Sequence, residues 1–524
     1  MRMPLHHAYW IDGVPPLGAF CTSTLRELEI AHNDGFNLAA YPGRDILDPD
    51  TPMGRFAQEN GIRAMYSING HIHGKPQLAR AIDARETTIP ITRGQAPAGP
   101  GLVAVDDELI RYREATETAL VGCERGADGT EPAPHEAWII LFWPEVLASE
   151  LASVVGSRNL WGYWALDDTP GNARSAMRAL YRTVRAVDPE HHPVCGGYSG
   201  ATTLHNFAPG TCDIVVPYWY PVLATGYERT MTAWDTQQIL AVVRKQVPGI
   251  PFIGIYQAFW GGYWNKATPL TAREVREQAE DFVREGAAGL MAFGIVHEDP
   301  SNPSNTYRGW QLDPEMTAAV REINAEVRAS CGMEVSPEPP ELAAVRIQPA
   351  GFHEHAVDVP GIPPAWHVIG PFDNGEVKGL DVVLPPERRI DLAARYDGKG
   401  GVSARWQTVA SQAGAVGLVE LYGPADNATA FAVCTVTNPV ARQVHLRTGS
   451  DDEILVRFNG REVWRHTGMR GAHMDSDVVP VTLPAGTTQI VAKVYNVGNQ
   501  WGFCFRFTGT DGKPLTGLTF SPEA

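Results

Sequence analysis

The sequence has few of the features that mark a zinc-binding or disulfide-linked protein, because its cysteines are scattered singly. No Cys-x-x-Cys motif is present, which argues against a zinc knuckle or a dithiol redox site. The wide spacing favours reduced and mostly buried thiols. The seven cysteines are Cys21, Cys123, Cys195, Cys212, Cys331, Cys434 and Cys504.

The chain also lacks clusters of positive charge and long apolar runs. Its formal net charge is -17 and its Lys and Arg residues do not gather in one place, so we expect neither nucleic acid nor an anionic membrane as a partner. No apolar stretch approaches the roughly 20 residues that span a bilayer. The N-terminal residues lack the apolar core of a signal peptide. We expect a cytoplasmic protein, or a secreted or periplasmic one if a leader was removed.

The first 332 residues alternate short apolar segments with helix-like ones. Eight such repeats are typical of an α/β fold, the (β/α)8 or TIM barrel. Residues 86–142 consist of short β-type runs, which predicts an all-β insertion after strand three. Residues 333–364 are rich in Pro and Glu and predict a linker. Residues 365–524 have a periodicity of two and predict a β-sandwich domain.

The most informative stretch runs from Leu160 to Pro170, where an apolar and aromatic segment ends in Asp167 and Asp168. The segment predicts the buried fourth strand of the barrel, so the two carboxylates should lie at the face where barrel active sites are built. Adjacent strand residues point to opposite faces, and therefore only one of the two can face the cleft directly. The alternative is that one aspartate caps the following helix.

Three patterns resemble known families. The opening of the chain resembles that of glycosidases with a (β/α)8 barrel, through Asp12, Gly13, Pro15, Gly18 and the run Gly35-Phe36-Asn37. The insertion, with Glu124-Arg125-Gly126-Ala127-Asp128-Gly129-Thr130 followed by His135, is similar to a small all-β module of phage-tail-type proteins. These resemblances imply a glycosidase-like barrel whose inserted module narrows the substrate cleft or contacts another protein.

The C-terminal pattern Ser450-Asp451-Asp452, followed by Asn459-Gly460, resembles β-sandwich modules of galactose-binding or PA14 type. Such modules are often appended to bacterial carbohydrate-active enzymes. In some relatives the paired aspartates hold calcium, which makes Asp451 and Asp452 candidate ligands of a structural calcium ion. The alternative is a polar β-turn.

Hydrolysis of a glycosidic bond needs one carboxyl group as the acid and a second as the base or nucleophile. The resemblance implies an acid/base at the end of strand four, where Asp168 stands, with Asp167 beside it. It also implies a nucleophilic Glu at the end of strand seven, but Gln257 occupies that place. We therefore expect Glu298, after strand eight, as the second carboxylate. Other candidates are Asp45, Asp48, Asp50 and Glu228.

Aromatic and polar side chains near the predicted strand ends are candidates for substrate binding, since flat rings stack on the C–H faces of sugars. Some of these rings, Trp164 and Trp219 above all, could instead pack the upper layer of the barrel. The candidates are Tyr41, Asn69, His71, His73, Trp164, Tyr218, Tyr220, Gln257, Trp260, Trp264 and His297, with Tyr263 and Asn265 in the same loop as Trp264.

We predict a glycoside hydrolase that acts on an oligo- or polysaccharide and needs no cofactor for its chemistry. Gln257 supports a second interpretation, a non-catalytic glycan-binding protein with a degenerate barrel. A third is a metal-dependent hydrolase that uses His71 and His73 with the aspartate pair. The sugar, its linkage, the stereochemistry of hydrolysis and the oligomeric state are left open.

Overall fold

The computed structural model describes residues 9–94, 96–167, 173–199, 201–218, 220–223, 226–227, 230–261, 270–295, 307–331, 360–375, 379–411, 414–423, 425–472, 476–498, 501–512 and 515–522. The chain divides into two compact units. One comprises residues 1–199 and 206–341, and the other comprises residues 200–205 and 342–524.

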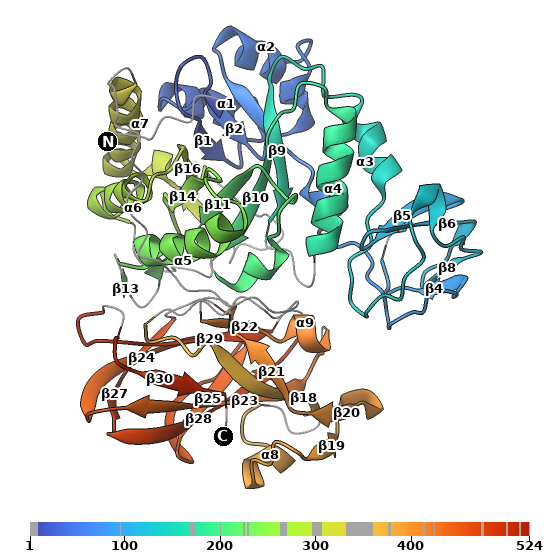
Figure 1. Cartoon of the computed structure of the whole chain (residues 1–524). Coiled ribbons are helices and arrows are strands. Elements are labelled where there is room, and N and C mark those ends of the chain that lie inside the picture. Colours follow the sequence, from blue (N-terminus) through green and yellow to red (C-terminus); the bar gives the residue numbers. More distant parts are fainter. Residues whose placement is uncertain are drawn as a thin grey trace. The chain divides into compact units, whose positions relative to one another are not determined.

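The first unit is built on a closed barrel of eight parallel strands, which confirms the predicted fold (Figure 1). Neighbouring strands in the barrel are also neighbours in sequence order, and the first strand pairs with the last. The barrel strands are β1 (Leu17–Phe20), β2 (Leu38–Ala40), β3 (Arg63–Ser67), β9 (Leu160–Leu166), β10 (Val194–Ser199), β11 (Ile214–Tyr218), β14 (Ile253–Gln257) and β16 (Gly289–Phe293).

Helices lie outside this barrel, and local signals set their ends. Thr24 and Thr271 each form a capping box with the glutamate three residues later, and Asp313 caps a helix that begins with Pro314. The helices are α1 (Leu25–Asn33), α2 (Pro52–Glu59), α3 (Pro144–Leu151), α4 (Arg174–Val187), α5 (Thr230–Gln246), α6 (Ala272–Arg284) and α7 (Pro314–Ser330). In the part of the chain that the structure describes, no helix is long and apolar enough to cross a membrane.

Alternate residues of each strand fill the barrel interior, as the period of a strand requires. Glycines make room for the largest of these side chains. A Cβ atom on Gly18 would lie 2.4 Å from Cγ of Met291, and one on Gly197 would lie 2.5 Å from the ring of Trp164. Large side chains on one strand therefore require glycine on its neighbour.

Asp34, just after α1, ties the first helix of the barrel to the last segment of the unit. Its carboxylate is almost fully buried and accepts hydrogen bonds from Trp310 Nε1 at 2.8 Å and Arg321 Nε at 2.7 Å. The Asn324 side chain donates to the carbonyl of the same aspartate at 2.9 Å. These contacts join residues nearly 300 positions apart and close the ring of helices.

The insertion after β3 is an all-β module beside α3 and α4 (Figure 1). It extends further toward the N-terminus than predicted, because Leu78 and Ile82 belong to its hydrophobic core and form bridges with the rest of the module. The predicted strand over 137–142 forms only isolated bridges. Its strands are β4 (Thr88–Pro90), β5 (Gly101–Val105), β6 (Glu108–Tyr112), β7 (Glu114–Ala115) and β8 (Ala119–Val121).

A buried ionic network explains the Arg125…His135 pattern of this module. Glu108 accepts a bidentate pair of 2.8 Å hydrogen bonds from Arg125 and one of 2.8 Å from His135 Nε2. The other ring nitrogen of His135 lies 2.8 Å from Asp106. Burial would raise the pKa of Glu108, but these partners and backbone N–H groups lower it to about 2. The pattern is therefore a structural one that closes the module on itself.

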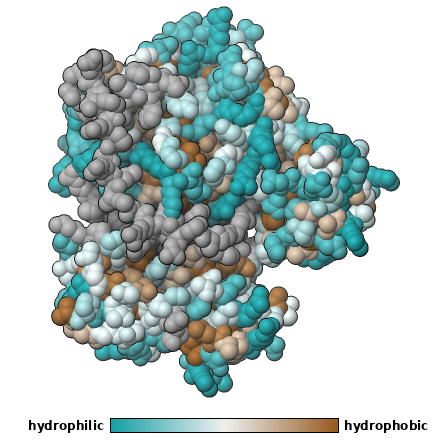
Figure 2. All heavy atoms as spheres, viewed as in Figure 1, coloured by the Kyte–Doolittle hydropathy of each residue, from teal (hydrophilic) through white to brown (hydrophobic). Residues whose placement is uncertain are grey.

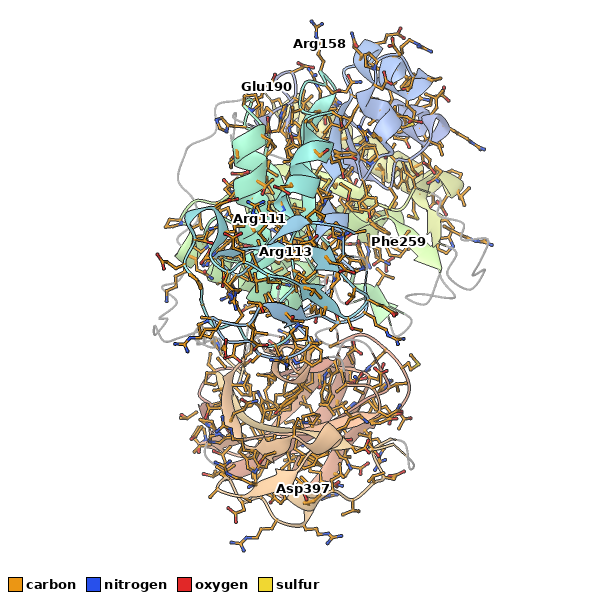
Figure 3. The ribbon with its side chains drawn as sticks, turned by 90° about the vertical axis from the view of Figure 1, so that its right-hand side faces the viewer. Arg111, Arg113, Arg158, Glu190, Phe259 and Asp397 are labelled. Carbon is orange, nitrogen blue, oxygen red and sulfur yellow. The ribbon has the colours of Figure 1, made fainter. Side chains whose placement is uncertain are left out.

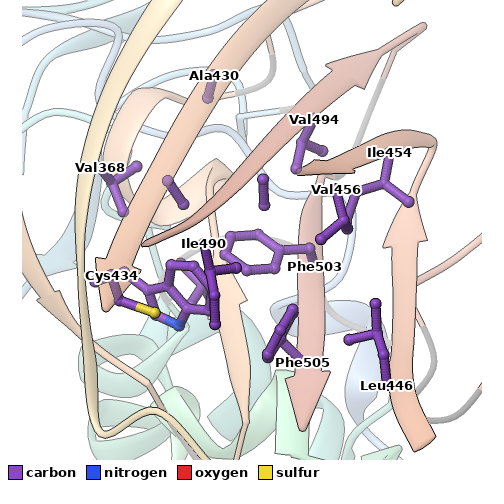
Figure 4. Packing of buried hydrophobic residues seen from close by; sticks show 14 of the residues in the cluster. Val368, Ala430, Cys434, Leu446, Ile454, Val456, Ile490, Val494, Phe503 and Phe505 are labelled. Atoms are coloured by element: carbon purple, nitrogen blue, oxygen red, sulfur yellow. The ribbon is translucent and has the colours of Figure 1, made fainter. Parts of the chain in front are cut away.

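The second unit contains two packed antiparallel sheets, as predicted for a β-sandwich. Trp366 lies in the core with its ring edge-on to Phe503 and Phe505, at centroid distances of 5.3 and 5.2 Å. Phe503 and Phe505 are labelled among the buried side chains in Figure 4. One sheet contains β18 (Ala365–Asp373), β21 (Gln407–Ala410), β23 (Ala428–Asn438), β25 (Glu453–Phe458), β26 (Arg461–His466), β28 (Gly486–Asn496) and β30 (Thr519–Ser521). The other contains β22 (Ala415–Gly417), β24 (Arg442–Asp451), β27 (Asp477–Leu483) and β29 (Gly502–Thr508).

Smaller elements complete this unit. They are the ribbon of β19 (Arg395–Asp397) and β20 (Ser403–Arg405) and two one-turn helices, α8 (Pro385–Arg388) and α9 (Val419–Tyr422). The sequence predicts no helix here, since segments of four residues carry no detectable helical period. Residues 332–359, which include most of the predicted linker, lie outside the described residues.

Candidate active site

The carboxyl ends of the barrel strands bring two of the predicted site residues together. Asp167 follows β9 directly, and Tyr218 is the last residue of β11. The Tyr218 hydroxyl donates a hydrogen bond of 3.0 Å to Oδ1 of Asp167. The Tyr218 side chain belongs to the buried cluster inside the barrel, whereas Asp167 is partly exposed. A carboxylate thus stands at the carboxyl-end face of the barrel, held by a residue from two strands away.

A continuous band of aromatic rings extends from Tyr218 along this face. Tyr218 and Tyr220 have ring centroids 6.0 Å apart, and Tyr220 lies 5.3 Å from Phe293. Phe293 lies 5.4 Å from Phe20, which lies 5.8 Å from the exposed ring of Tyr41. The band therefore crosses the ends of β11, β16, β1 and β2.

The sequence prediction includes both ends of this band but not Phe20, Phe293 or the adjoining Phe259, which contacts Tyr220 and Phe293 at 5.1 and 5.2 Å. Phe20 and Phe293 are the last residues of β1 and β16. The sequence signal for Phe20 and Phe293 is an aromatic residue at the last position of a predicted barrel strand, because the last residues of the strands lie in one layer of the barrel.

The residues after β1 and β2 have unusual backbone conformations. Cys21 and Tyr41 adopt left-handed φ values of 64° and 57°. Such strain costs roughly 1–3 kcal/mol per residue and often occurs at functional sites. Burial, together with the charge of Asp167, raises the pKa of the Cys21 thiol to about 12, so this cysteine is not an activated nucleophile.

Gln257, predicted to contact a sugar hydroxyl, has a different role in the structure. Its side chain is fully buried at the end of β14. The amide oxygen accepts from Val222 N at 3.0 Å, and the amide nitrogen donates to the carbonyls of Val222 at 3.2 Å and Phe259 at 3.3 Å. Because every polar atom of this side chain is engaged by backbone groups, the geometry favours a structural role over sugar binding.

Three other residues that were predicted to bind substrate do not belong to the aromatic band. Trp164 is fully buried and packs edge-on against Phe20 at 5.2 Å, which agrees with the alternative that it fills the barrel. Asn69 is also buried. Trp260 lies in β15 (Phe259–Gly261), opposite Arg308 of β17 (Tyr307–Gly309). It therefore lies on the face of this ribbon opposite to Phe259, which is labelled in Figure 3.

The two histidines after β3 have different surroundings. Nε2 of His71 lies 2.8 Å from Glu150 of α3, whose other oxygen accepts from the Tyr66 hydroxyl at 2.8 Å. The pKa of Glu150 is lowered, chiefly by His71. His73 is exposed. Among the residues that the structure describes, no group of three or more His, Cys, Asp or Glu side chains could hold a metal ion.

Eight residues named from the sequence lie outside the described residues. They are Asp168, Trp219, Glu228, Tyr263, Trp264, Asn265, His297 and Glu298. Their predicted roles remain predictions.

A groove of about 590 Å³ lies between the β module and helices α3 and α4, on the outside of the barrel. Three of its carboxylates contact cationic side chains: Asp106 contacts His135, Asp107 contacts Arg182, and Asp128 contacts Arg111. Arg111 and Arg113 mark this module in Figure 3, and its visible face is mixed rather than uniformly hydrophobic (Figure 2). This groove therefore differs from the aromatic band in two ways: it contains carboxylates that are paired with cationic side chains, and the surface of its module mixes hydrophilic and hydrophobic residues.

The second unit contains the candidate calcium ligands. Asp452 accepts hydrogen bonds from the backbone N–H groups of Arg470 at 3.1 Å and Val497 at 2.8 Å. Burial and the neighbouring Asp452 raise the pKa of Asp451 to about 8. Asn496, one register position beyond the Glu453–Tyr495 pair, has a buried side-chain oxygen without a hydrogen-bond partner. Calcium prefers oxygen ligands of this kind, so these residues fit the ion.

Comparisons with known proteins give matches to solved structures only. No family model matches the sequence, and no curated protein sequence matches it. A beta-galactosidase from Rahnella sp. R3 is 12% identical over 63% of this chain, with a TM-score of 0.39. This chain spans 58% of the length of that enzyme.

Two further matches concern the whole chain and its C-terminal part. A glucosidase from Croceicoccus marinus is 10% identical, covers 92% of this chain and 96% of its own, and has a TM-score of 0.34. The PA14 domain of the antifreeze protein MpAFP is 12% identical, covers 30% of this chain and 89% of its own, and has a TM-score of 0.21. The chain is thus similar to solved glycosidase structures at low identity.

Proposed function

We propose that this protein is a carbohydrate-active enzyme that hydrolyses a glycosidic bond at the carboxyl-end face of its barrel. The observation that supports the proposal best is the Asp167–Tyr218 pair at one end of the aromatic band. Aromatic rings provide flat apolar surfaces for sugar C–H faces, and a carboxylate beside them supplies either acid/base chemistry or a hydrogen-bond acceptor for hydroxyls.

In the proposed mechanism, Asp168 protonates the leaving oxygen and Glu298 acts as the base or nucleophile. Asp167, adjacent in sequence and hydrogen-bonded to Tyr218, is the second candidate for the acid. A separation of roughly 5–5.5 Å between the two reacting carboxyl groups gives retention, and roughly 6.5–9.5 Å gives inversion. The substrate is an oligo- or polysaccharide, and the reaction itself requires no cofactor.

Hydrolysis of a panel of aryl glycosides and polysaccharides tests the proposal. We expect the wild-type protein to release aglycone or reducing ends from at least one substrate. Asp168→Asn and Glu298→Gln should each lower kcat by at least about 100-fold, the lower range for loss of general acid–base catalysis. Asp167→Asn is compared with both. If Asp168→Asn retains wild-type turnover while Asp167→Asn does not, the acid is Asp167.

A specific observation favours a second candidate, a glycan-binding protein without catalysis. Gln257 replaces the carboxylate that similar glycosidases carry after strand seven, and its amide is engaged by Val222 and Phe259. Glycan binding by the intact chain, measured by calorimetry, with no hydrolysis of the bound glycan after prolonged incubation, would support this candidate over the enzyme.

We also propose that the second unit binds a structural calcium ion through Asp451 and Asp452. The paired carboxylates and the unpartnered oxygen of Asn496 support this proposal. The ion would neutralise two adjacent acidic groups and hold β24 against the segment that begins β25.

A further inference from the structure

The side chain of Gln257 links the end of β14 to Val222, which follows β11 in the chain. The registered pairing between β11 and β14 is Tyr218 with Ile255, and in the described residues the ladder between these strands does not continue beyond it. Past this point the Gln257 amide makes the connection. It bonds both the N–H and the C=O of Val222, in the manner of a backbone ladder pair.

The groups that Gln257 holds lie on either side of an aromatic contact. Its amide nitrogen donates to the carbonyls of both Val222 and Phe259, at 3.2 and 3.3 Å. Val222 stands two residues after Tyr220 and begins β12 (Val222–Leu223), which pairs with β13 (Gly226–Tyr227). The rings of Tyr220 and Phe259 meet at 5.1 Å. One side chain therefore fixes the backbone beside both partners of this ring pair.

The backbone of Gln257 is held as well. Its N–H donates to Oε1 of Gln278 at 2.9 Å, and Gln278 is itself fully buried in α6. Gln278 donates to the carbonyl of Glu274 at 3.1 Å. The side chain of Gln257 thus projects from a position fixed by a second buried glutamine.

We infer that Gln257 is a positioning residue that holds the Tyr220 ring against the fully buried Phe259 ring, so that the partly exposed Tyr220 can stack on a sugar at the barrel mouth. This inference rests on the proposed function. It explains the amide at a position where similar glycosidases carry a carboxylate: a carboxylate could accept from Val222 N but could not donate to the two carbonyls. The glutamine is then a requirement of the Tyr220 segment and not the remnant of a lost nucleophile.

Three variants of the full chain test the inference. Gln257→Met keeps the volume but removes the hydrogen bonds to Val222 and Phe259. Gln257→Glu removes only the donors. Asn159→Leu is the matched control, because it removes another buried amide that donates to two backbone carbonyls, those of Ile46 and Gly54 rather than those of Val222 and Phe259. Two measurements are made on each: amide hydrogen exchange at Val222, and KM and kcat on the best glycoside substrate of the wild-type protein.

We expect Gln257→Met to raise the exchange rate at Val222 at least tenfold and to raise KM at least tenfold, with kcat within threefold of wild type. Asn159→Leu should leave the Val222 exchange rate and KM within threefold of wild type. At pH 7, Gln257→Glu should resemble Gln257→Met in exchange rate and in KM. At pH 5, where a protonated carboxyl donates again, the ratio of its KM to that of the wild-type protein should fall at least threefold.

Unchanged exchange at Val222, or an unchanged KM, in a folded Gln257→Met variant overturns the inference while leaving the proposed function intact. Faster hydrolysis by Gln257→Glu at pH 7 also overturns it, because that result identifies a lost nucleophile position. A wild-type protein that neither hydrolyses nor binds any member of the glycan panel refutes the proposed function, and the positioning role falls with it.

Discussion

The hydroxyl of Tyr218 donates to the carboxylate of Asp167 at 3.0 Å, across two strands of the barrel and at its carboxyl end. A hydrogen bond to a charged acceptor contributes about 1.5–3 kcal/mol. Tyr218→Phe should therefore lower kcat/KM by at least about tenfold, since 1.4 kcal/mol corresponds to tenfold. Steady-state kinetics on an aryl glycoside measure this change.

Tyr66→Phe is the matched control, because Tyr66 donates to Glu150 at 2.8 Å on the outer side of β3. It removes the same kind of hydrogen bond from a pair that does not border the aromatic band. We expect its kcat/KM to stay within twofold of wild type. Equal losses of kcat/KM in Tyr218→Phe and Tyr66→Phe would mean that the hydrogen bond between Tyr218 and Asp167 contributes to stability alone.

A second prediction concerns closure of the barrel by Asp34. Asp34→Ala leaves the buried Trp310 N–H without its acceptor, and we expect a loss of about 2–4 kcal/mol in the free energy of unfolding. Arg321→Gln removes the other partner, which is largely exposed, and should cost at most about 1 kcal/mol. Guanidinium unfolding of the full chain measures both. A larger effect of Arg321→Gln would show that the ion pair, and not the indole, closes the ring.

The barrel could be predicted because each of its strands and helices leaves a local period in the sequence. The seven-residue run of β9 is buried throughout, as its apolar sequence predicts. The site could be predicted only in part. That Asp167 lies at a strand end follows from the apolar run before it, but its bond to Tyr218 joins residues 51 positions apart. The side chain of Gln257 bonds to Val222, 35 residues earlier in the chain, and no local sequence pattern encodes such a contact.

A third prediction follows from the ionic network of the β module. Burial would lower the pKa of His135, but its hydrogen bonds to Asp106 and Glu108 raise that pKa above 6.5. A raised histidine pKa contributes stability that is present below pH 6.5 and is lost as the pH rises through the raised value. Protection of β5 and β6 amides, corrected for intrinsic exchange, should therefore fall as the pH rises above 6.5.

His135→Gln should abolish most of this dependence, whereas Asp107→Asn, which alters an exposed carboxylate of the same module, should preserve it. At the acidic end, the lowered pKa of Glu108 predicts stability that is present above pH 4.5 and is lost as the pH falls toward 2. Protection that is independent of pH over both ranges would contradict the role assigned to the network.

The last prediction concerns calcium in the second unit, for which Asp451, Asp452 and the unpartnered side-chain oxygen of Asn496 are the candidate ligands. Extracellular modules bind calcium with Kd values of roughly 0.1–1 mM, so 10 mM calcium should stabilise the folded unit by up to about 2.7 kcal/mol. For a unit of this size that corresponds to a Tm increase of roughly 5–10 °C relative to EDTA, measured by calorimetry. Magnesium should have a smaller effect, because it demands octahedral geometry. Asp451→Asn with Asp452→Asn should remove the calcium effect, since two neutral amides leave the ion without anionic ligands. An undiminished increase in that double variant would place the ion elsewhere, and no increase in the wild-type chain would leave the pair as a polar turn.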